Sequence, residues 1–208
     1  MNFGIADDIA ILLITVGPLK AAIVYARLTG GADRALRRAI AFRTVIVATI
    51  VLLIFIVFGE FILRIFHISL PALKLAGGLI LLLFALGMVM GDDQNGLGSG
   101  GPATIAVATY PLAMPLMATP QGIVAVVTLA AAKPELSNII LLIVIILAIM
   151  GLNLVVLLSA DKILGKGSGG AMQVVGRVVG LLLAGLAMQL MILGLTDLGL
   201  IPAAAQAH

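Results

Sequence analysis

The chain has 208 residues, of which 62% are hydrophobic and 10% are charged, with a formal net charge of +3 and no cysteine. Soluble domains are typically about 45–50% apolar and about 25% charged, so this composition excludes an ordinary soluble domain. Apolar runs of about 20 residues, the length that crosses a bilayer as a helix, fill almost the whole chain. We therefore expect one all-α, polytopic membrane domain over residues 1–208, with the lipid bilayer as its surroundings.

Few side chains are suited to catalysis, metal binding or nucleic-acid binding. The absence of cysteine excludes thiolate metal sites and Cys nucleophiles, and His67 and His208 are the only histidines. No Ser/His/Asp set and no HExxH motif can be assembled. The basic residues lie mostly at predicted helix ends, where retention of positive charge in the cytoplasm explains them. We expect no enzyme, no catalytic residue, no metal, no cofactor and no nucleic-acid partner.

The apolar runs predict six transmembrane helices. A basic segment with Arg27, Arg34, Arg37 and Arg38 follows the first, and a Gly-rich polar linker occupies residues 92–102. The helices are expected at about residues 7–28, 44–65, 72–90, 103–132, 136–159 and 172–196.

Prolines interrupt the first and the fourth of these helices. Pro18 lies in the first, and Pro111, Pro115 and Pro120 lie in the fourth. Because proline removes a helix hydrogen bond and clashes with the preceding turn, a continuous helix is not expected at either place. In lipid, such a break is tolerated only where protein or a water-filled cavity surrounds it. Two broken segments at matching places in two halves are typical of a transporter binding site.

The two halves of the chain resemble each other. A shift of 103 residues places Lys74 on Arg177 and Gly77 on Gly180, and Pro120 follows Pro18 by 102 residues. A unit with an odd number of spans must have its repeat inserted upside down. The pattern therefore predicts a 3+3 inverted repeat, made of residues 1–91, the linker 92–102 and residues 103–208.

Loop charges predict the orientation in the membrane. With the N-terminus outside, the inner loops carry most of the basic residues, so the positive-inside rule places both termini on the extracytoplasmic side. The inner loops contain Arg27, Arg34, Arg37, Arg38, Lys162 and Lys166, and the outer loops contain Arg64, Lys74 and Lys133.

The two breaks are also candidate helix starts. Gly17-Pro18 and Thr119-Pro120 each offer a capping residue followed by a proline at the first helical position. Each start would direct free N–H groups and a positive dipole end at an anionic group such as a carboxylate. Carbonyls released from the preceding half-helix could accept hydrogen bonds from an ammonium. This combination predicts a substrate site for a zwitterionic amino acid.

Four further polar residues are candidates for this substrate site. Lys20 lies two residues after Pro18, and an intramembrane Lys costs on the order of 2.5–3.5 kcal/mol on insertion scales, which favours a functional role. The alternative is that Lys20 extends along the helix to the inner membrane surface. Thr15, Gln121 and Asn153 are weaker candidates, because Thr, Gln and Asn often serve as hydrogen-bonding groups between membrane helices.

Several motifs carry a family resemblance. They are Phe58-Gly-Glu-Phe-Ile-Leu-Arg64, Ile68-Ser-Leu-Pro71, Ala76-Gly-Gly78, Pro111-Leu-Ala-Met-Pro115 and Pro120. In this order they resemble the MarC family of bacterial inner-membrane proteins, over essentially all six predicted helices. The resemblance implies a relationship to LysE-like exporters and, through the SnatA branch, transport of small neutral amino acids.

The chain departs from the family pattern at the expected site. Many relatives have Asn-Pro, a glycine and a second proline where this chain has Gly17-Pro18-Leu19-Lys20. Glycines are also frequent in relatives around the proline that follows Thr119. The identity of the substrate is therefore the property that these departures leave open.

We predict a secondary transporter that exports small neutral amino acids or related metabolites by alternating access, driven by a coupling proton or monovalent cation. An ion or metal exporter of the LysE-like type is one alternative. A non-transporting membrane module is another, and it would pack dry with no cavity at Pro18 and Pro120. Three small-residue patterns would allow a homo-oligomer without requiring one. They are Gly87–Gly91, Ala118–Gly122 and Gly176–Gly180.

Overall fold

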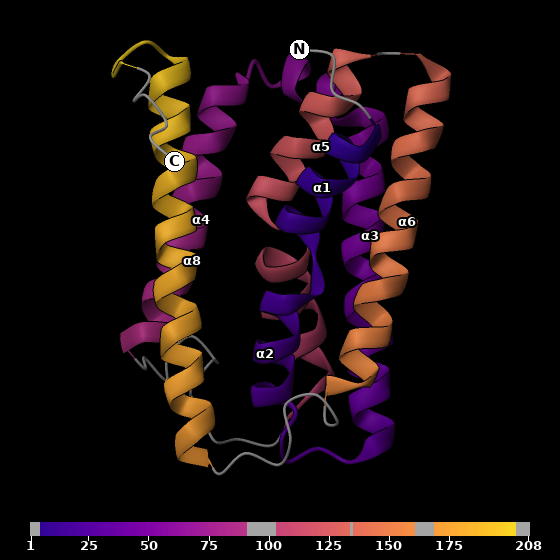
Figure 1. Cartoon of the computed structure of the whole chain (residues 1–208), viewed down its shortest axis with the longest axis vertical. Coiled ribbons are helices and arrows are strands. Elements are labelled where there is room, and N and C mark those ends of the chain that lie inside the picture. Colours follow the sequence, from indigo (N-terminus) through magenta and orange to yellow (C-terminus); the bar gives the residue numbers. More distant parts are fainter. Residues whose placement is uncertain (1–4, 91–102, 134, 161–168, 203–208) are drawn as a thin grey trace.

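The computed structural model describes residues 5–90, 103–133, 135–160 and 169–202, and these residues form a bundle of helices with no strand among them (Figure 1). Within the described residues, five stretches are long and apolar enough to cross a membrane, and a bent pair of helices makes a sixth. The prediction of an all-α membrane protein is thereby confirmed. The predicted linker at 92–102 lies outside the described residues.

The first span is broken where the sequence predicts. Helix α1 (Ile5–Val16) ends before Gly17, and α2 (Pro18–Leu28) begins at the proline. The backbone of Gly17 is extended, with φ −66° and ψ 165°, so the two helices do not continue into each other. Proline is suited to this first helical position because its missing N–H would have no partner there.

The second span, α3 (Arg34–Ile65), begins ten residues earlier than expected, since the prediction placed its start at Thr44. The side chain of Asp33 accepts a hydrogen bond from the N–H of Leu36 at 2.7 Å and caps the helix. The assignment of Arg34, Arg37 and Arg38 to a loop was therefore wrong. An Asp that caps a helix can start it even when the first helical turns are rich in charged residues, because the cap satisfies a free N–H group there.

Helices α4 (Leu70–Met90) and α8 (Gly169–Asp197) form an antiparallel pair at one side of the bundle (Figure 1). Glycines allow the close approach: a Cβ added at Gly78 would overlap Met191, and one added at Gly180 would lie 2.9 Å from the Cβ of Met88. At one end, an ion pair between Lys74 and Asp197 joins the two helices.

These two contacts are alike but do not obey the predicted shift of 103 residues, which would place Gly77 and not Gly78 against Met191. A glycine of α4 contacts a methionine of α8, and a glycine of α8 contacts a methionine of α4. The inverted repeat itself remains a prediction. Gly122 and Gly180, from two of the small-residue patterns, are used for contacts within this chain.

The remaining helices surround the second break. A short 3₁₀ turn, η2 (Ile105–Ala108), leads into η3 (Thr109–Met117), which is interrupted by the extended residues Tyr110 and Met114. The peptide bonds before Pro111 and Pro115 are cis. Helix α5 (Pro120–Ala132) follows at an angle of 56° to this segment, and α6 (Leu136–Leu158) packs against α3. The fourth predicted helix is thus irregular before Pro120 and regular after it.

Candidate functional site

The second break is organised by Thr119. Ala118 and Thr119 are not helical, and Pro120 is the first residue of α5. The hydroxyl of Thr119 accepts a hydrogen bond from the N–H of Gly122 at 2.9 Å, which caps α5. This is the arrangement of a capping residue and a proline that the sequence predicts.

The two breaks lie against each other in the middle of the bundle. The hydroxyl of Thr119 donates a hydrogen bond to the carbonyl oxygen of Thr15 at 2.9 Å, which joins the start of α5 to the end of α1. Gly122 lies so close to α1 that an added Cβ would be 2.6 Å from Cγ2 of Val16. Residues about 100 positions apart in the sequence are therefore neighbours in the fold.

Lys20 and Asn153 also bind main-chain oxygens at the end of α1. The ammonium of Lys20 donates to the carbonyl of Thr15 at 3.3 Å, so its side chain points back toward the break and away from Arg27. The amide nitrogen of Asn153, on α6, donates to the carbonyl of Val16 at 3.0 Å. The end of α1 thus receives donors from α2, α5 and α6, which replace the N–H donors that an unbroken helix would supply.

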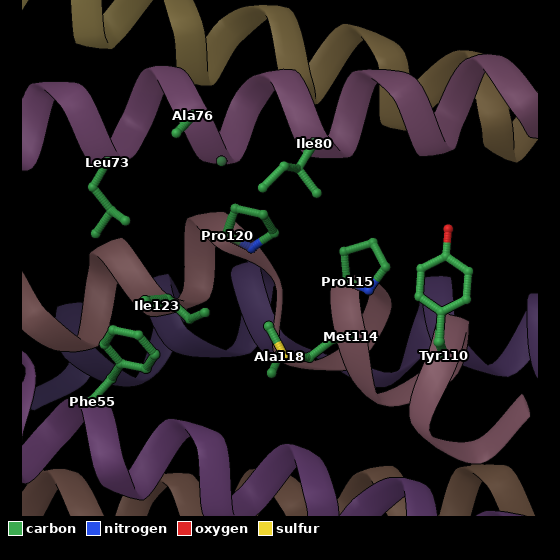
Figure 2. Close-up of a pocket in the computed structure, with 11 residues that line it drawn as sticks. Phe55, Leu73, Ala76, Ile80, Tyr110, Met114, Pro115, Ala118, Pro120 and Ile123 are labelled. Atoms are coloured by element: carbon green, nitrogen blue, oxygen red, sulfur yellow. The ribbon is translucent and has the colours of Figure 1, made fainter. Parts of the chain in front are cut away.

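A cavity of about 220 Å³ lies on the other side of the second break, between α3, α4 and the η3–α5 segment. Figure 2 shows Leu73, Ala76 and Ile80 on α4 facing Pro115 and Pro120. The cavity is lined by Phe55, Leu73, Ala76, Gly77, Ile80, Tyr110, Met114, Pro115, Ala118, Pro120 and Ile123. Its lining is almost wholly apolar.

This cavity is open toward the outside of the bundle. Ile80 and Tyr110, on its rim, are 57% and 55% exposed. The ring of Tyr110 stands edge-on to that of Phe84, with centroids 6.4 Å apart. The cavity is therefore a lateral recess beside the break and not a sealed space.

The eight predicted site residues divide into three groups. Gly17, Pro18, Lys20, Thr119 and Asn153 meet at the end of α1. Pro120 forms the second group, because it is the only one of the eight that lines the cavity. Thr15 belongs to the first group through its carbonyl, because its hydroxyl donates to Ile11 in the same helix, at 2.8 Å. Gln121 is directed elsewhere, since its amide nitrogen donates to the carbonyl of Leu186 on α8 at 3.1 Å.

Most cavity-lining residues were not predicted. Phe55 and Ile80 are aliphatic or aromatic side chains in long apolar runs, so nothing in the sequence distinguishes them from lipid-facing neighbours. Pro115 could have been predicted, because a proline at this position indicates the irregular segment that forms one wall of the cavity. Among the described residues, no group of three His, Asp or Glu side chains is arranged to hold a metal ion.

Comparison with known proteins identifies the family. The MarC family of integral membrane proteins matches residues 4–198. A UPF0056 membrane protein of Methanocaldococcus jannaschii is 34% identical over 86% of this chain and 90% of its own length. The UPF0056 inner membrane protein YhgN of Escherichia coli K12 is 28% identical over 89% of this chain and 92% of its own length. No solved structure matches the chain. With the motif resemblance confirmed over nearly the whole length, the chain belongs to the MarC family of integral membrane proteins.

Proposed function

We propose that the protein is a secondary transporter that exports small neutral amino acids or related metabolites by alternating access. The observation that carries this proposal is the meeting of two proline breaks, joined by the bond from Thr119 to Thr15, beside a cavity that Pro120 lines. Broken helices that meet near the middle of a bundle place helix ends where a polar solute can be bound inside the membrane.

The chemistry of the two sides of the break suits an amino acid. Helix α5 begins at Pro120 with the positive end of its dipole, which favours a carboxylate. The carbonyl of Thr15 at the end of α1 could accept from an ammonium in exchange for the Lys20 donor that it has in this structure. The apolar lining of the cavity would accept an aliphatic side chain. Its volume of about 220 Å³ is below the range of about 300–1,000 Å³ that holds drug-sized ligands, which favours a smaller solute.

We also propose the orientation in which both termini are extracytoplasmic, in a bacterial inner membrane. The first turn of α1 and the last turn of α8 lie at the same end of the bundle (Figure 1). Arg27 and Arg34 lie at the opposite end, together with the further arginines at the start of α3. The positive-inside rule assigns that end to the cytoplasm.

Solute counterflow into proteoliposomes tests the proposal. Purified protein would be reconstituted and supplied with labelled neutral, acidic and basic amino acids and with labelled monovalent cations. We expect accumulation of small neutral amino acids, and its loss in Pro120→Ala. Flux of cations alone would support the ion exporter, and no flux from folded protein would support a non-transporting module.

A further inference from the structure

Helix α1 turns an acidic side chain inward and apolar side chains outward. Asp8 is only 4% exposed, whereas Ile9, the next residue, is 41% exposed. Asp8 shares one stripe of α1 with the fully buried Leu12 and Val16, because residues four apart lie on the same face of a helix. Aspartate is almost never this deeply buried unless it is paired.

The stripe of Asp8, Leu12 and Val16 leads from one end of the bundle to the helix break. Eight residues of helix place Asp8 about 12 Å from Val16 along the axis. At the inner end of the stripe, Gly122 of α5 packs against Val16, and α1 as a whole packs against α5 and α6. Asp8 therefore lies inside the bundle, at the end where α1 begins.

The Asp8 carboxyl has no partner in the described part of the chain. Its Oδ1 is inaccessible and accepts no hydrogen bond. Helices α5 and α6 contain no charged or titratable residue, and no ion pair joins Asp8 to Lys133 or Glu135 in the turn between them. On its own span, Lys20 lies further along, at the break, and the side chain of Asp7 is outside the described ones.

The dipole of α1 does not account for this burial. A carboxylate is favoured in the first turn of a helix, but this effect is smaller than the cost of burying an unpaired ionised group. Asp33 shows the ordinary arrangement, since it is exposed and accepts the N–H of Leu36 at the start of α3. Asp8 makes no such bond. The protonated acid carries no charge and avoids the cost of burying one.

We propose that Asp8 is a proton-binding site that holds this end of the bundle closed. In the closed arrangement of this structure, its carboxyl is protonated. When α1 separates from α5 at this end, water reaches the carboxyl, its O–H bond breaks and the proton passes to that water. Closing takes one proton back. The switch does not depend on transport, but its consequence, that solute leaves past Asp8 only after this proton is released, rests on the proposed function.

Infrared spectroscopy of the purified full chain in detergent tests the protonation. At neutral pH, the wild type is expected to show the carbonyl stretching band of a protonated carboxylic acid, and Asp8→Asn should weaken or remove it. Glu60→Gln is the matched control and should leave the band unchanged, because Glu60 is exposed and pairs with Arg64. A wild type without the band, or a folded Asp8→Asn variant that keeps it in full, would overturn the proposal.

Labelling of a buried thiol tests the closing. Leu12→Cys places a thiol on the stripe between Asp8 and the break, in a chain without natural cysteine. Dividing its rate of reaction with a maleimide by that of the exposed Ser69→Cys corrects for the ionisation of thiols as pH rises. Because the closed form holds one more proton than the open form, this ratio should rise with pH by up to about tenfold per pH unit.

The same ratio should be independent of pH in Asp8→Asn. An equal rise with and without Asp8 would overturn the proposal, as would a ratio that is independent of pH in the wild type. Val16→Cys replaces Leu12→Cys if the latter does not fold, and Asp8→Ser replaces Asp8→Asn in the same case, with unchanged expectations. Absence of counterflow from every form would remove the proposed function, and the spectroscopic and labelling measurements would still decide the switch.

Discussion

Gly77 of α4 lies directly against Pro120, so that a Cβ added at this glycine would be only 2.5 Å from the Cβ of the proline. Helix α4 therefore rests on the first residue of α5, at the edge of both the second break and the cavity. The contact is with a rigid ring, which cannot move aside as a flexible side chain could. Any side chain at this position must displace one of the two helices.

Gly77→Ala is accordingly expected to lower stability by about 1–3 kcal/mol, the usual cost of overpacking a close contact. Thermal unfolding in detergent measures the effect. Gly151→Ala on α6 is the control, because no atom lies within 4 Å of the position of its added Cβ. Equal stability of the two variants would show that α4 does not press on the break.

Thr119→Val tests the bridge between the two breaks. The substitution removes both the cap of α5 and the hydrogen bond to Thr15, so we expect a loss of about 1–2 kcal/mol, mostly from the cap. Thr119→Ser keeps the hydroxyl and should unfold near the wild-type temperature. Thr49→Val is the control, since its hydroxyl donates only within its own helix, to Val45. A valine variant at position 119 as stable as this control contradicts the bridge.

Gln121→Ala separates packing from substrate binding. The amide of Gln121 donates to Leu186 on α8, so its loss should cost about 0.6 kcal/mol of stability, the average for hydrogen bonds between membrane helices. Once transport is measured, the KM of this variant should stay within about twofold of the wild-type value, because a side chain that does not contact the solute does not alter its binding. A tenfold rise in KM would return Gln121 to the substrate site.

Orientation can be measured directly because the natural chain has no cysteine. Single cysteines at Ser69 and at Ala35 would lie at opposite ends of the bundle, and both positions are exposed. In intact cells, a membrane-impermeant maleimide is expected to label Ser69→Cys and to leave Ala35→Cys unlabelled until the membrane is opened. The reverse pattern would place both termini in the cytoplasm.

The backbone of the site could be predicted from the sequence, because its causes are local. Pro18 and Pro120 cannot continue a helix, and Thr119 supplies a cap, so the two breaks follow from neighbouring residues alone. The start of α3 at Arg34 was missed although Asp33 is a good cap, because the arginines that follow were interpreted as a loop.

The contacts of the site could not be predicted, because they join distant parts of the chain. Thr15 acts through its carbonyl, which no sequence pattern reveals, and the destination of the Gln121 side chain depends on where α8 packs. The cavity arises from the separation of α3 and α4 by an irregular segment. Its apolar side chains, such as Ile80, have the same composition as the lipid-facing surface.

Filling the cavity tests the central claim most directly. Ala76 lies on α4 at the cavity wall, and Ala76→Trp would occupy the space while leaving the break intact. Ala148→Trp, at an exposed position on α6, is the matched control. Counterflow of a small neutral amino acid should fall at least tenfold in Ala76→Trp and remain near the wild-type rate in Ala148→Trp, with both proteins folded. Undiminished counterflow with the cavity filled would contradict the assignment of this recess and its adjoining helix break as the path of the solute.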